Sequence, residues 1–268
     1  MKVVFAKLSF MCVSVIVMSF WVGGSSAKVD LKTTAGMWLF DEGTGTQARD
    51  SSGEDNHGKL MNGPKWVKGK FGGALEFDGV DDIVVSGSKL GISGNAERTT
   101  AFWIRPTSSE GFQLIVAWGQ AGDQKAYWAE YNGNQGGANT IRVAGYDGDI
   151  YTKSKLLPLN QWHHVAVVYP GKIPETKLYY NGVSQEILLW GKEALNTVDT
   201  PVTIGDAPFL HKINRRAFKG AIDEVVIYSV ALAEADIKRI MTEGFQATPT
   251  AVSSSGKLAS IWGAIKNQ

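Results

Sequence analysis

The segment that decides the fold is Phe218–Tyr228, with the sequence FKGAIDEVVIY. Its last four residues are strong strand formers, so the segment is predicted to be a β-strand. Side chains alternate between the two faces of a strand, which would place Asp223 with Val225 on one face and Glu224 on the other. Both faces are mostly apolar, so we expect a strand covered on both sides. Each carboxylate then needs an ion pair, hydrogen bonds or a metal ion.

The chain begins with a predicted secretory signal peptide, residues 1–27. Lys2 and Lys7 are its only charges, Leu8–Val22 is almost entirely apolar, and three small residues follow. The alternative is an uncleaved anchor, which the short apolar core disfavours. Cys12 is the only cysteine, so the exported chain can form no disulfide. We therefore expect a protein that is secreted or held at the cell surface or in the periplasm.

The charge of the remaining chain excludes two classes of partner. The full sequence has a formal net charge of +1, and loss of the two leader lysines leaves −1. A nearly neutral chain has no electrostatic basis for binding nucleic acid or an anionic membrane. No long apolar run follows the leader, so no membrane span is predicted. We expect a monomer.

The body of the chain is predicted to be one all-β domain over residues 36–244. Short strand-like runs alternate with turns rich in Gly, Asn and Asp. The expected strands are 37–40, 74–77, 83–85, 100–104, 112–118, 127–131, 140–146, 163–169, 177–180, 202–204 and 221–228, with 187–190 as a weaker candidate. Asn181-Gly182 predicts a type I′ hairpin turn. Residues 41–65 and 185–200 are expected to be long loops, and only Ala233–Met241 predicts a helix, ended by Gly244.

The composition changes after this domain. Residues 245–256 are predicted to be a flexible linker because they are rich in Ala, Thr, Pro and Ser. Residues 257–268 form a short amphipathic tail, in which Leu258, Ile261, Trp262 and Ile265 follow helical spacing. Two interpretations of the tail stay open, a sorting or docking tag and a frayed terminus.

Several sequence strings carry a family resemblance. They are MWLFDEGTG (37–45), DSSGEDNHG (50–58), KGKFGGALEFDGVDD (68–82), QWHHVA (161–166), LYYNG (178–182) and the segment quoted first. Their order and spacing resemble the laminin G-like domains of the concanavalin A-like lectin/glucanase superfamily. The resemblance implies a jelly-roll sandwich of two antiparallel sheets, with its first and last strands side by side. The expected fold is therefore an all-β two-sheet antiparallel jelly roll with one short C-terminal helix.

The resemblance also implies a structural calcium ion between the first long loop and the last strand. It assigns Asp50, Asn56 and Asp223 as ligands, with Asp41 and Glu42 as candidates of lower rank. Calcium takes about six to eight oxygen ligands, which carboxylates, amides and a turn-rich backbone can supply. The alternative is that these Asp and Asn residues form turns by bonding their own backbone, with no ion.

The candidate ligand contacts are aromatic residues with one neighbouring acid. They are Trp118, Trp128, Tyr131, Tyr146 and Asp147, with Tyr151 and Trp190 as further aromatic candidates. Aromatic rings stack on the apolar faces of sugar rings as on other flat apolar groups. For any one of these aromatics, packing in the core is the alternative, because sandwich cores also use many Trp and Tyr.

The sequence shows no residues set aside for chemistry. Glucanases of the superfamily carry Glu-x-Asp-x-x-Glu on one strand, and this chain lacks that pattern. His164 has no visible partner base or nucleophile, so it is expected to pack beside an aromatic. We expect a secreted, non-catalytic module that binds carbohydrate or another matrix or surface component. The alternatives are a structural or adhesive protein with a protein partner, and a glycoside hydrolase or lyase of unfamiliar pattern.

Overall fold

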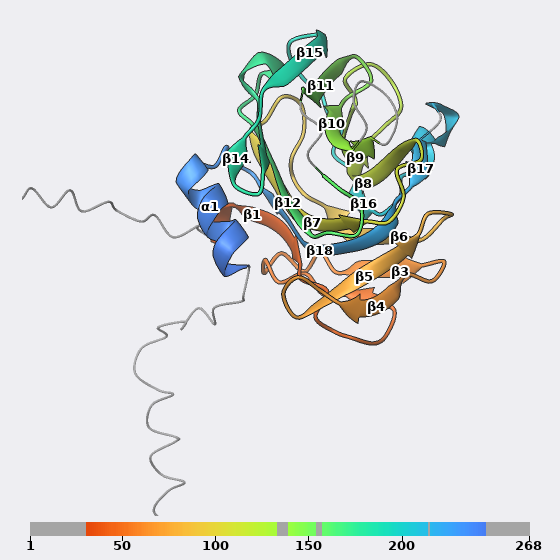
Figure 1. Ribbon diagram of the computed structural model, residues 1–268. Coiled ribbons are helices and arrows are strands. Elements are labelled where there is room, and N and C mark those ends of the chain that lie inside the picture. Colours follow the sequence, from red (N-terminus) through yellow and green to blue (C-terminus); the bar gives the residue numbers. More distant parts are fainter. Residues whose placement is uncertain (1–30, 133–138, 154–156, 214, 245–268) are drawn as a thin grey trace, which may run out of the picture.

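Two β-sheets packed face to face form the body of the protein (Figure 1). The computed structural model describes residues 31–132, 139–153, 157–213 and 215–244. The predicted leader, linker and tail lie outside these residues. Within the described part, no helix is long and apolar enough to cross a membrane.

The first sheet has eight strands and contains the segment quoted at the outset. In spatial order they are β14 (Val183–Ser184), β13 (Lys177–Tyr180), β12 (His163–Tyr169), β7 (Arg98–Pro106), β18 (Lys219–Tyr228), β5 (Gly73–Asp78) and β4 (Lys65–Lys68), while β1 (Thr34–Trp38) also pairs with β18. The pairing of β1 with β18 is antiparallel and confirms that the first and last strands lie side by side.

The second sheet has ten strands. In spatial order they are β15 (Ile187–Gly191), β11 (Gly148–Thr152), β10 (Thr140–Ala144), β9 (Ala126–Asn132), β8 (Phe112–Gly119), β16 (Pro201–Ile204), β6 (Ile83–Lys89), β3 (Gly58–Met61) and β2 (Gln47–Ala48). The short β17 (Arg215–Ala217) pairs with β8 in parallel, whereas the other pairings are antiparallel. The helical elements are α1 (Glu234–Glu243) and the short 3-10 turns η1 (Leu31–Thr33), η2 (Ile173–Glu175) and η3 (Pro208–Ile213).

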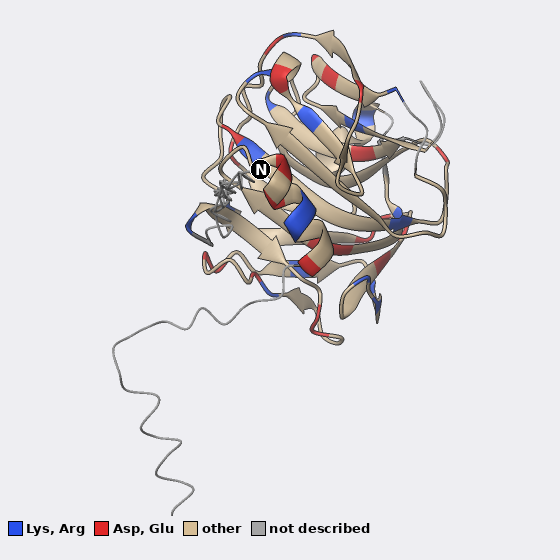
Figure 2. Ribbon diagram, turned by 60° about the vertical axis from the view of Figure 1, so that its left-hand side comes forward, with Lys and Arg blue, Asp and Glu red and all other residues tan. Residues whose placement is uncertain are grey.

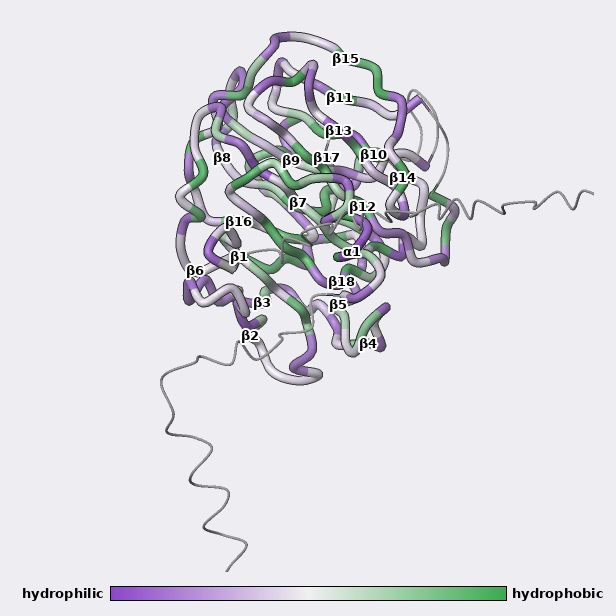
Figure 3. The backbone as a smooth tube through the Cα atoms, turned by 90° about the vertical axis from the view of Figure 1, so that its left-hand side faces the viewer, coloured by the Kyte–Doolittle hydropathy of each residue, from purple (hydrophilic) through white to green (hydrophobic). Residues whose placement is uncertain are grey.

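Apolar side chains from both sheets fill the space between them. Phe102 and Val165 of the first sheet meet Trp118 and Tyr127 of the second in one continuous buried cluster. Helix α1 covers part of the outer face of the eight-stranded sheet through Ile237 and its neighbours. Figure 3 shows the hydrophobic stretches on the strands and the hydrophilic ones in most connections. The jelly-roll sandwich with one short helix is therefore confirmed.

A β-bulge corrects the expected side-chain alternation of β18. The pairing with β7 shifts register between Asp223 and Val226, and Glu224 has φ of 48°. The extra residue reverses the phase of the strand, so Ile222 and Val225 both point into the inter-sheet core. Asp223 therefore does not share the face of Val225. The expectation that the strand is covered on both sides is confirmed, because every residue after Lys219 is buried.

Several strands formed where loops were expected. The tract 41–65 contains β2 and β3, and β4 follows directly. In β3 only alternate residues are buried, so the segment has no continuous apolar run. Strand β11 was missed because it begins with Gly148-Asp149, a pair typical of turns. The Asn181-Gly182 turn is confirmed, with positive φ at both residues.

Candidate functional site

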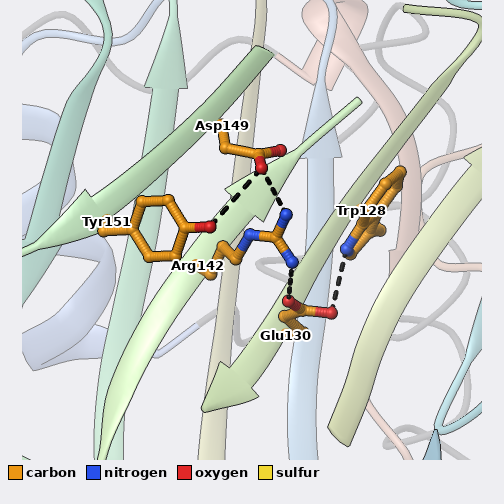
Figure 4. A network of polar contacts seen from close by, with 5 residues as sticks. All are labelled: Trp128, Glu130, Arg142, Asp149 and Tyr151. Atoms are coloured by element: carbon orange, nitrogen blue, oxygen red, sulfur yellow. Dashed lines mark hydrogen bonds and ion pairs between the residues drawn. The ribbon is translucent and has the colours of Figure 1, made fainter. Parts of the chain in front are cut away.

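A row of polar side chains crosses the outer face of the ten-stranded sheet. Glu130 on β9 lies opposite Arg142 on β10, which lies opposite Tyr151 on β11. These residues alternate with residues of the inter-sheet core, so they point away from it. Trp128 of β9 and Asp149 of β11 occupy the next row. We call Trp128, Glu130, Arg142, Asp149 and Tyr151 the network face (Figure 4).

One arginine connects the two acids of the network face. Arg142 Nη1 donates to Glu130 Oε1 at 2.8 Å, and Arg142 Nη2 donates to Asp149 Oδ2. Trp128 Nε1 donates to Glu130 Oε2 at 3.0 Å, so both Glu130 oxygens are bonded (Figure 4). The Tyr151 hydroxyl lies 3.5 Å from Asp149 Oδ2. Asp149 Oδ1 is buried and has no hydrogen-bond partner among the residues that the structure describes.

The network face holds more negative than positive charge in a desolvated position. Burial by itself would lower the pKa of Arg142, but the Glu130 and Asp149 carboxylates outweigh it and raise that pKa. Arg142 therefore stays charged, and its guanidinium also lies 5.1 Å from the Tyr151 ring. The guanidinium neutralises the charge of one of the two carboxylates, so the site keeps a net negative charge. Asp149 Oδ1 remains available as an acceptor.

Strand β15 forms an exposed apolar rim beside this network. Trp190 pairs in register with Asp149, and Leu188 with Tyr151, so these side chains extend the same outer face. Trp190 is 73% exposed and Leu188 is 50% exposed. Figure 3 shows β15 at the margin of the molecule with a hydrophobic stretch. An aromatic ring open to solvent therefore lies next to a buried acceptor.

The predicted ligand contacts separate into two groups. Trp118 and Tyr131 are fully buried in the inter-sheet core, where the Tyr131 hydroxyl donates to the Leu157 carbonyl. Trp128 lies on the outer face, and its ring meets that of the half-buried Tyr146 edge-on at 5.4 Å. The structure thus brings only part of the predicted set together.

Asp147 lies near the network face without belonging to it. Its carboxylate is 3.5 Å from Lys192 Nζ, and both side chains are exposed. The backbone oxygen of Asp147 accepts a hydrogen bond from the Lys192 amide at 3.1 Å. These contacts fix the turn before β11, so Asp147 helps to place Asp149 and Tyr151 rather than joining them.

The central charged residues of the network face were missing from the sequence-derived site. Glu130, Arg142 and Asp149 are each the charged member of a largely apolar strand. Each of these three strands has a polar residue at an outward-facing position, and this recurrence is the signal that could have indicated a shared face. That signal needs the pairing of β9, β10 and β11, and β11 itself had not been recognised.

Asp50, a predicted calcium ligand, instead organises its own loop. Its Oδ1 accepts from the Met37 amide at 2.8 Å and the Ser52 amide at 2.9 Å. Its Oδ2 accepts from Ser52 Oγ at 2.8 Å and the Asn56 amide at 2.9 Å. Because a carboxylate has about four lone-pair sites, these bonds leave none free for an ion.

Asn56, the second predicted ligand, is also satisfied by protein groups. Its Oδ1 accepts from the Ser88 amide at 3.0 Å and from the Ser88 hydroxyl. Its Nδ2 donates to the carbonyls of Lys89 and Ala35, the latter at the long distance of 3.5 Å. Asn56 therefore joins the loop to β1 and β6.

Asp223 is bonded to a different loop from the one expected. Its Oδ2 accepts from the amides of Lys70 at 2.8 Å and Phe71 at 3.1 Å, in the connection between β4 and β5. Burial raises the pKa of Asp223 to about 7, against the lowering effect of these amides and that of Glu224. The charge of Asp41 raises this pKa further, which places Asp41 nearby. The second oxygen, Oδ1, has no hydrogen bond of good geometry.

Asp41 and Glu42 complete the predicted calcium set. Asp41 Oδ1 accepts from the Gly73 amide, and Glu42 Oε1 accepts from the Arg49 amide, both at 2.7 Å. Asp50 and Asn56 are thus bonded to each other and to groups around the first loop, whereas Asp223 and Asp41 accept from amides of residues 70–73. The donor set as arranged does not fit a calcium cage, and calcium binding stays a prediction.

Comparisons with known proteins identify the family. The model of the concanavalin A-like lectin/glucanases superfamily matches residues 78–238, more than half of the chain. The chain belongs to this superfamily. No curated protein matches the sequence significantly. The resemblance to laminin G-like jelly-roll domains is therefore confirmed at the level of family and fold.

Solved members with this fold are distant in sequence. Domain 4 of AbnA, a GH43 extracellular arabinanase from Geobacillus stearothermophilus solved with arabinotriose, has a TM-score of 0.60 and 17% identity, covering 78% of this chain and 98% of its own. The binding domain of Paraclostridial Mosquitocidal Protein 1 has a TM-score of 0.58 and 15% identity, and the match covers 81% of this chain and 53% of that one. Trypanosoma rangeli sialidase in complex with 2,3-difluorosialic acid has a TM-score of 0.58 and 16% identity, and the match covers 87% of this chain and 36% of that one. At these identities the similarity shows the shared fold.

Proposed function

We propose that this superfamily member is a secreted, non-catalytic module that binds neutral glycans through the network face. The observation that carries the proposal is the pairing of exposed Trp190 with buried Asp149, whose Oδ1 lacks a partner. A sugar ring could stack on the indole while one of its hydroxyl groups donates to that oxygen. Sugar sites combine an apolar platform with a few fixed polar groups in this way.

The charge of the network face favours neutral sugars. Two carboxylates surround one guanidinium, so an anionic sugar would meet an excess of like charge. Charged side chains elsewhere are mixed, and Figure 2 shows acidic and basic residues interspersed on the elements in view. AbnA domain 4, solved with arabinotriose, supports neutral oligosaccharides as the first class to test.

A non-catalytic role is supported by how the two acids are bound. Glycosidases need one carboxyl group free to give a proton and a second free to attack or to activate water. Glu130 has both oxygens bonded, to Arg142 and Trp128, and Asp149 is bound by the same Arg142. The paired arrangement suits a rigid binding surface, so we expect no release of reducing sugar from polysaccharides.

A glycan array followed by calorimetry with arabinotriose tests the proposal. We expect binding to neutral glycans, a loss of about tenfold or more for Trp190→Ala, and a similar loss for Asp149→Asn. Val183→Ala, an exposed apolar residue on the other sheet, is the matched control and should bind normally. A flat array, or equal binding by Trp190→Ala and Val183→Ala, would contradict the proposal.

A protein partner is the second candidate function, favoured by the edge strand β15. One side of β15 pairs with β11, and no strand of the described residues pairs with its other side. Leu188, Leu189 and Trp190 are exposed on this strand, which makes it a template for strand addition. Under this alternative the glycan array is flat, and Leu189→Lys, which places a charge on the exposed edge strand, abolishes partner binding.

A further inference from the structure

A cleft lies on the eight-stranded sheet, opposite the network face and beside helix α1. It has a volume of about 600 Å³ and is lined by Lys70, Phe71, Trp103, Trp162, Asn181, Met241 and Thr242. We call it the α1 cleft. On the sheet beneath, Trp103 of β7 lies in register between Asp223 of β18 and His164 of β12. The cleft is therefore built on the outer face of the central strands.

Aromatic rings form the walls of the α1 cleft. The Phe71 ring meets Trp103 edge-on at 6.0 Å, and the His164 ring lies 5.3 Å from the same indole at a tilt of 60°. Trp162 is half-buried. Trp103 and His164 are buried, whereas the half-buried Phe71 and Trp162 rings offer apolar surface that suits the face of a ring-shaped ligand.

The polar groups at the α1 cleft are mostly donors. Lys70 Nζ lies 4.7 Å above the Trp103 ring and is exposed to solvent. Trp103 Nε1 is buried and has no hydrogen-bond partner in the described part of the chain. Asn181 uses its Oδ1 to accept from the His164 amide at 2.9 Å, which leaves its NH₂ group to donate. Buried donors without partners are uncommon, and a ligand acceptor would satisfy the indole.

Two other charged groups near the α1 cleft, Asp223 through its Oδ2 and Arg105, have protein partners. Asp223 Oδ2 holds the amides of Lys70 and Phe71, and thereby fixes the wall that carries both side chains. A side chain at Gly69 would come within 2.6 Å of Asp223 Oδ2, so glycine is needed for this close approach. Arg105, whose guanidinium lies 5.3 Å from the Trp162 ring, is 3.8 Å from Glu76. Lys70 is thus the free cation among the residues that line the α1 cleft.

We propose that the α1 cleft is a second glycan subsite, specific for a uronic acid residue. The apolar face of the sugar ring lies against the half-buried Phe71 and Trp162 rings, and its carboxylate receives Lys70 Nζ and the Trp103 Nε1–H. The subsite is independent of the network face, which lies on the other sheet and favours neutral sugars. The two sites together would let one domain bind a glycan that carries both neutral and acidic residues.

Calorimetric titration of the whole protein with short oligogalacturonides tests the subsite. We expect binding that weakens about tenfold or more in Lys70→Gln, and that weakens in high salt, because the contact is a charge-assisted hydrogen bond. Lys68→Gln is the matched control, since Lys68 is an exposed lysine of the preceding strand outside the cleft lining. Fully methyl-esterified oligogalacturonides, which lack the charge, should bind as weakly to the wild type as the acid form binds to Lys70→Gln.

Four outcomes would overturn this inference. The first three are no binding of oligogalacturonides, equal affinity in Lys70→Gln and Lys68→Gln, and equal affinity for the acid and the ester, and the fourth concerns Trp190→Ala. Trp190→Ala separates the two proposals: it should leave oligogalacturonide binding unchanged while it removes neutral glycan binding. Loss of uronide binding in Trp190→Ala would place the acid on the network face and contradict a second subsite.

Discussion

Asp50 holds the loop after β2 with both of its carboxylate oxygens. It accepts hydrogen bonds from the amides of Met37, Ser52 and Asn56 and from the Ser52 hydroxyl. Asp50→Ala leaves the buried Met37 and Asn56 amides without an acceptor, which costs about 1–3 kcal/mol for each. We expect the free energy of unfolding, measured in urea, to fall by about 3 kcal/mol.

The same residue allows a test of the calcium prediction. Because the Asp50 oxygens are filled by N–H and O–H donors, we expect the loss in Asp50→Ala to be equal with added calcium and with EDTA. Glu54→Ala, an exposed acid of the same loop, is the control and should unfold like the wild type. A loss that appears only in calcium would show that Asp50 acts through an ion.

His164 makes the stability of the protein depend on pH. It is fully buried, both ring nitrogens lack hydrogen bonds, and burial lowers its pKa from 6.5 to about 3. Between these two pKa values the unfolded chain binds a proton that the folded protein does not. The free energy of unfolding therefore keeps the contribution of neutral His164 above pH 6.5 and loses it progressively as the pH falls toward 3.

The variant His164→Phe isolates this effect. The free energy of unfolding of this variant, relative to that of the wild type, should rise by up to about 1.4 kcal/mol for each pH unit below 6. This is the upper limit because His164 binds at most one proton. Urea unfolding of both proteins at pH 7.5, 5.5 and 4.5 measures it. A difference that stays constant with pH would mean that His164 is solvated or finds a partner in the folded state.

Residue types alone could not decide which aromatics face a ligand. Trp118 and Trp128 were equivalent candidates, yet one is in the inter-sheet core and the other is on the outer face. The phase of each strand decides this, and β8 carries a bulge between Leu114 and Val116 that changes the phase midway. Tyr131 lies in the inter-sheet core because of the phase of its own strand, β9.

At the scale of elements, strand positions were predictable and strand phase was not. β12 and β13 have the expected bounds because strong strand formers fill them. In β18 the bulge rests on Glu224 at positive φ, a conformation usually marked by glycine. With glutamate there, the sequence carried no signal for the reversal that moves Asp223 to the outer face.

The connection after β16 is an element whose glycine is essential. Gly205 has φ of 86°, and an added Cβ would collide with the buried Phe77 ring of β5. Its amide and carbonyl are bonded to Ile115 and Phe218, so the backbone cannot move away. Gly205→Ala should therefore cost backbone strain plus overpacking, about 3 kcal/mol in all.

Gly91→Ala is the matched control for Gly205→Ala. Gly91 has a similar φ of 74°, and an added Cβ there would meet nothing within 4 Å. We expect it to cost about 1 kcal/mol, which is the backbone strain alone. Urea unfolding of both variants gives the comparison, and equal losses would show that Phe77 can move aside.

At the scale of the whole molecule, the sandwich followed from strand pattern and from the family strings. The network face did not, because it requires the pairing of β9, β10 and β11 and one of these strands resembled a turn. The α1 cleft was also inaccessible to the sequence. It joins β7, the residue before β12, the turn after β13 and the connection before β5 to a helix that follows them all.

Strand β18, near the end of the described chain, lies in the middle of its sheet, so folding depends on the C-terminal region. Strand β18 lies between β7 and β5 and also pairs with β1, so it contacts strands from the start and the middle of the chain. Without β18 these strands would expose unpaired backbone edges, and the inter-sheet core would lose Ile222, Val225 and Ile227. A chain ending at Phe218 should therefore not fold cooperatively.

A chain ending at Gly244 is the matched truncation, since it retains β18 and α1. Far-UV circular dichroism and urea unfolding should show a cooperative transition for this chain and none for the shorter one. The longer chain must bring β1 and β18 together across nearly its whole length, so its refolding should be slow, on the order of milliseconds to seconds. Cooperative unfolding of the chain that ends at Phe218 would show that the remaining strands can close the sandwich, and that β18 adds stability without determining the fold.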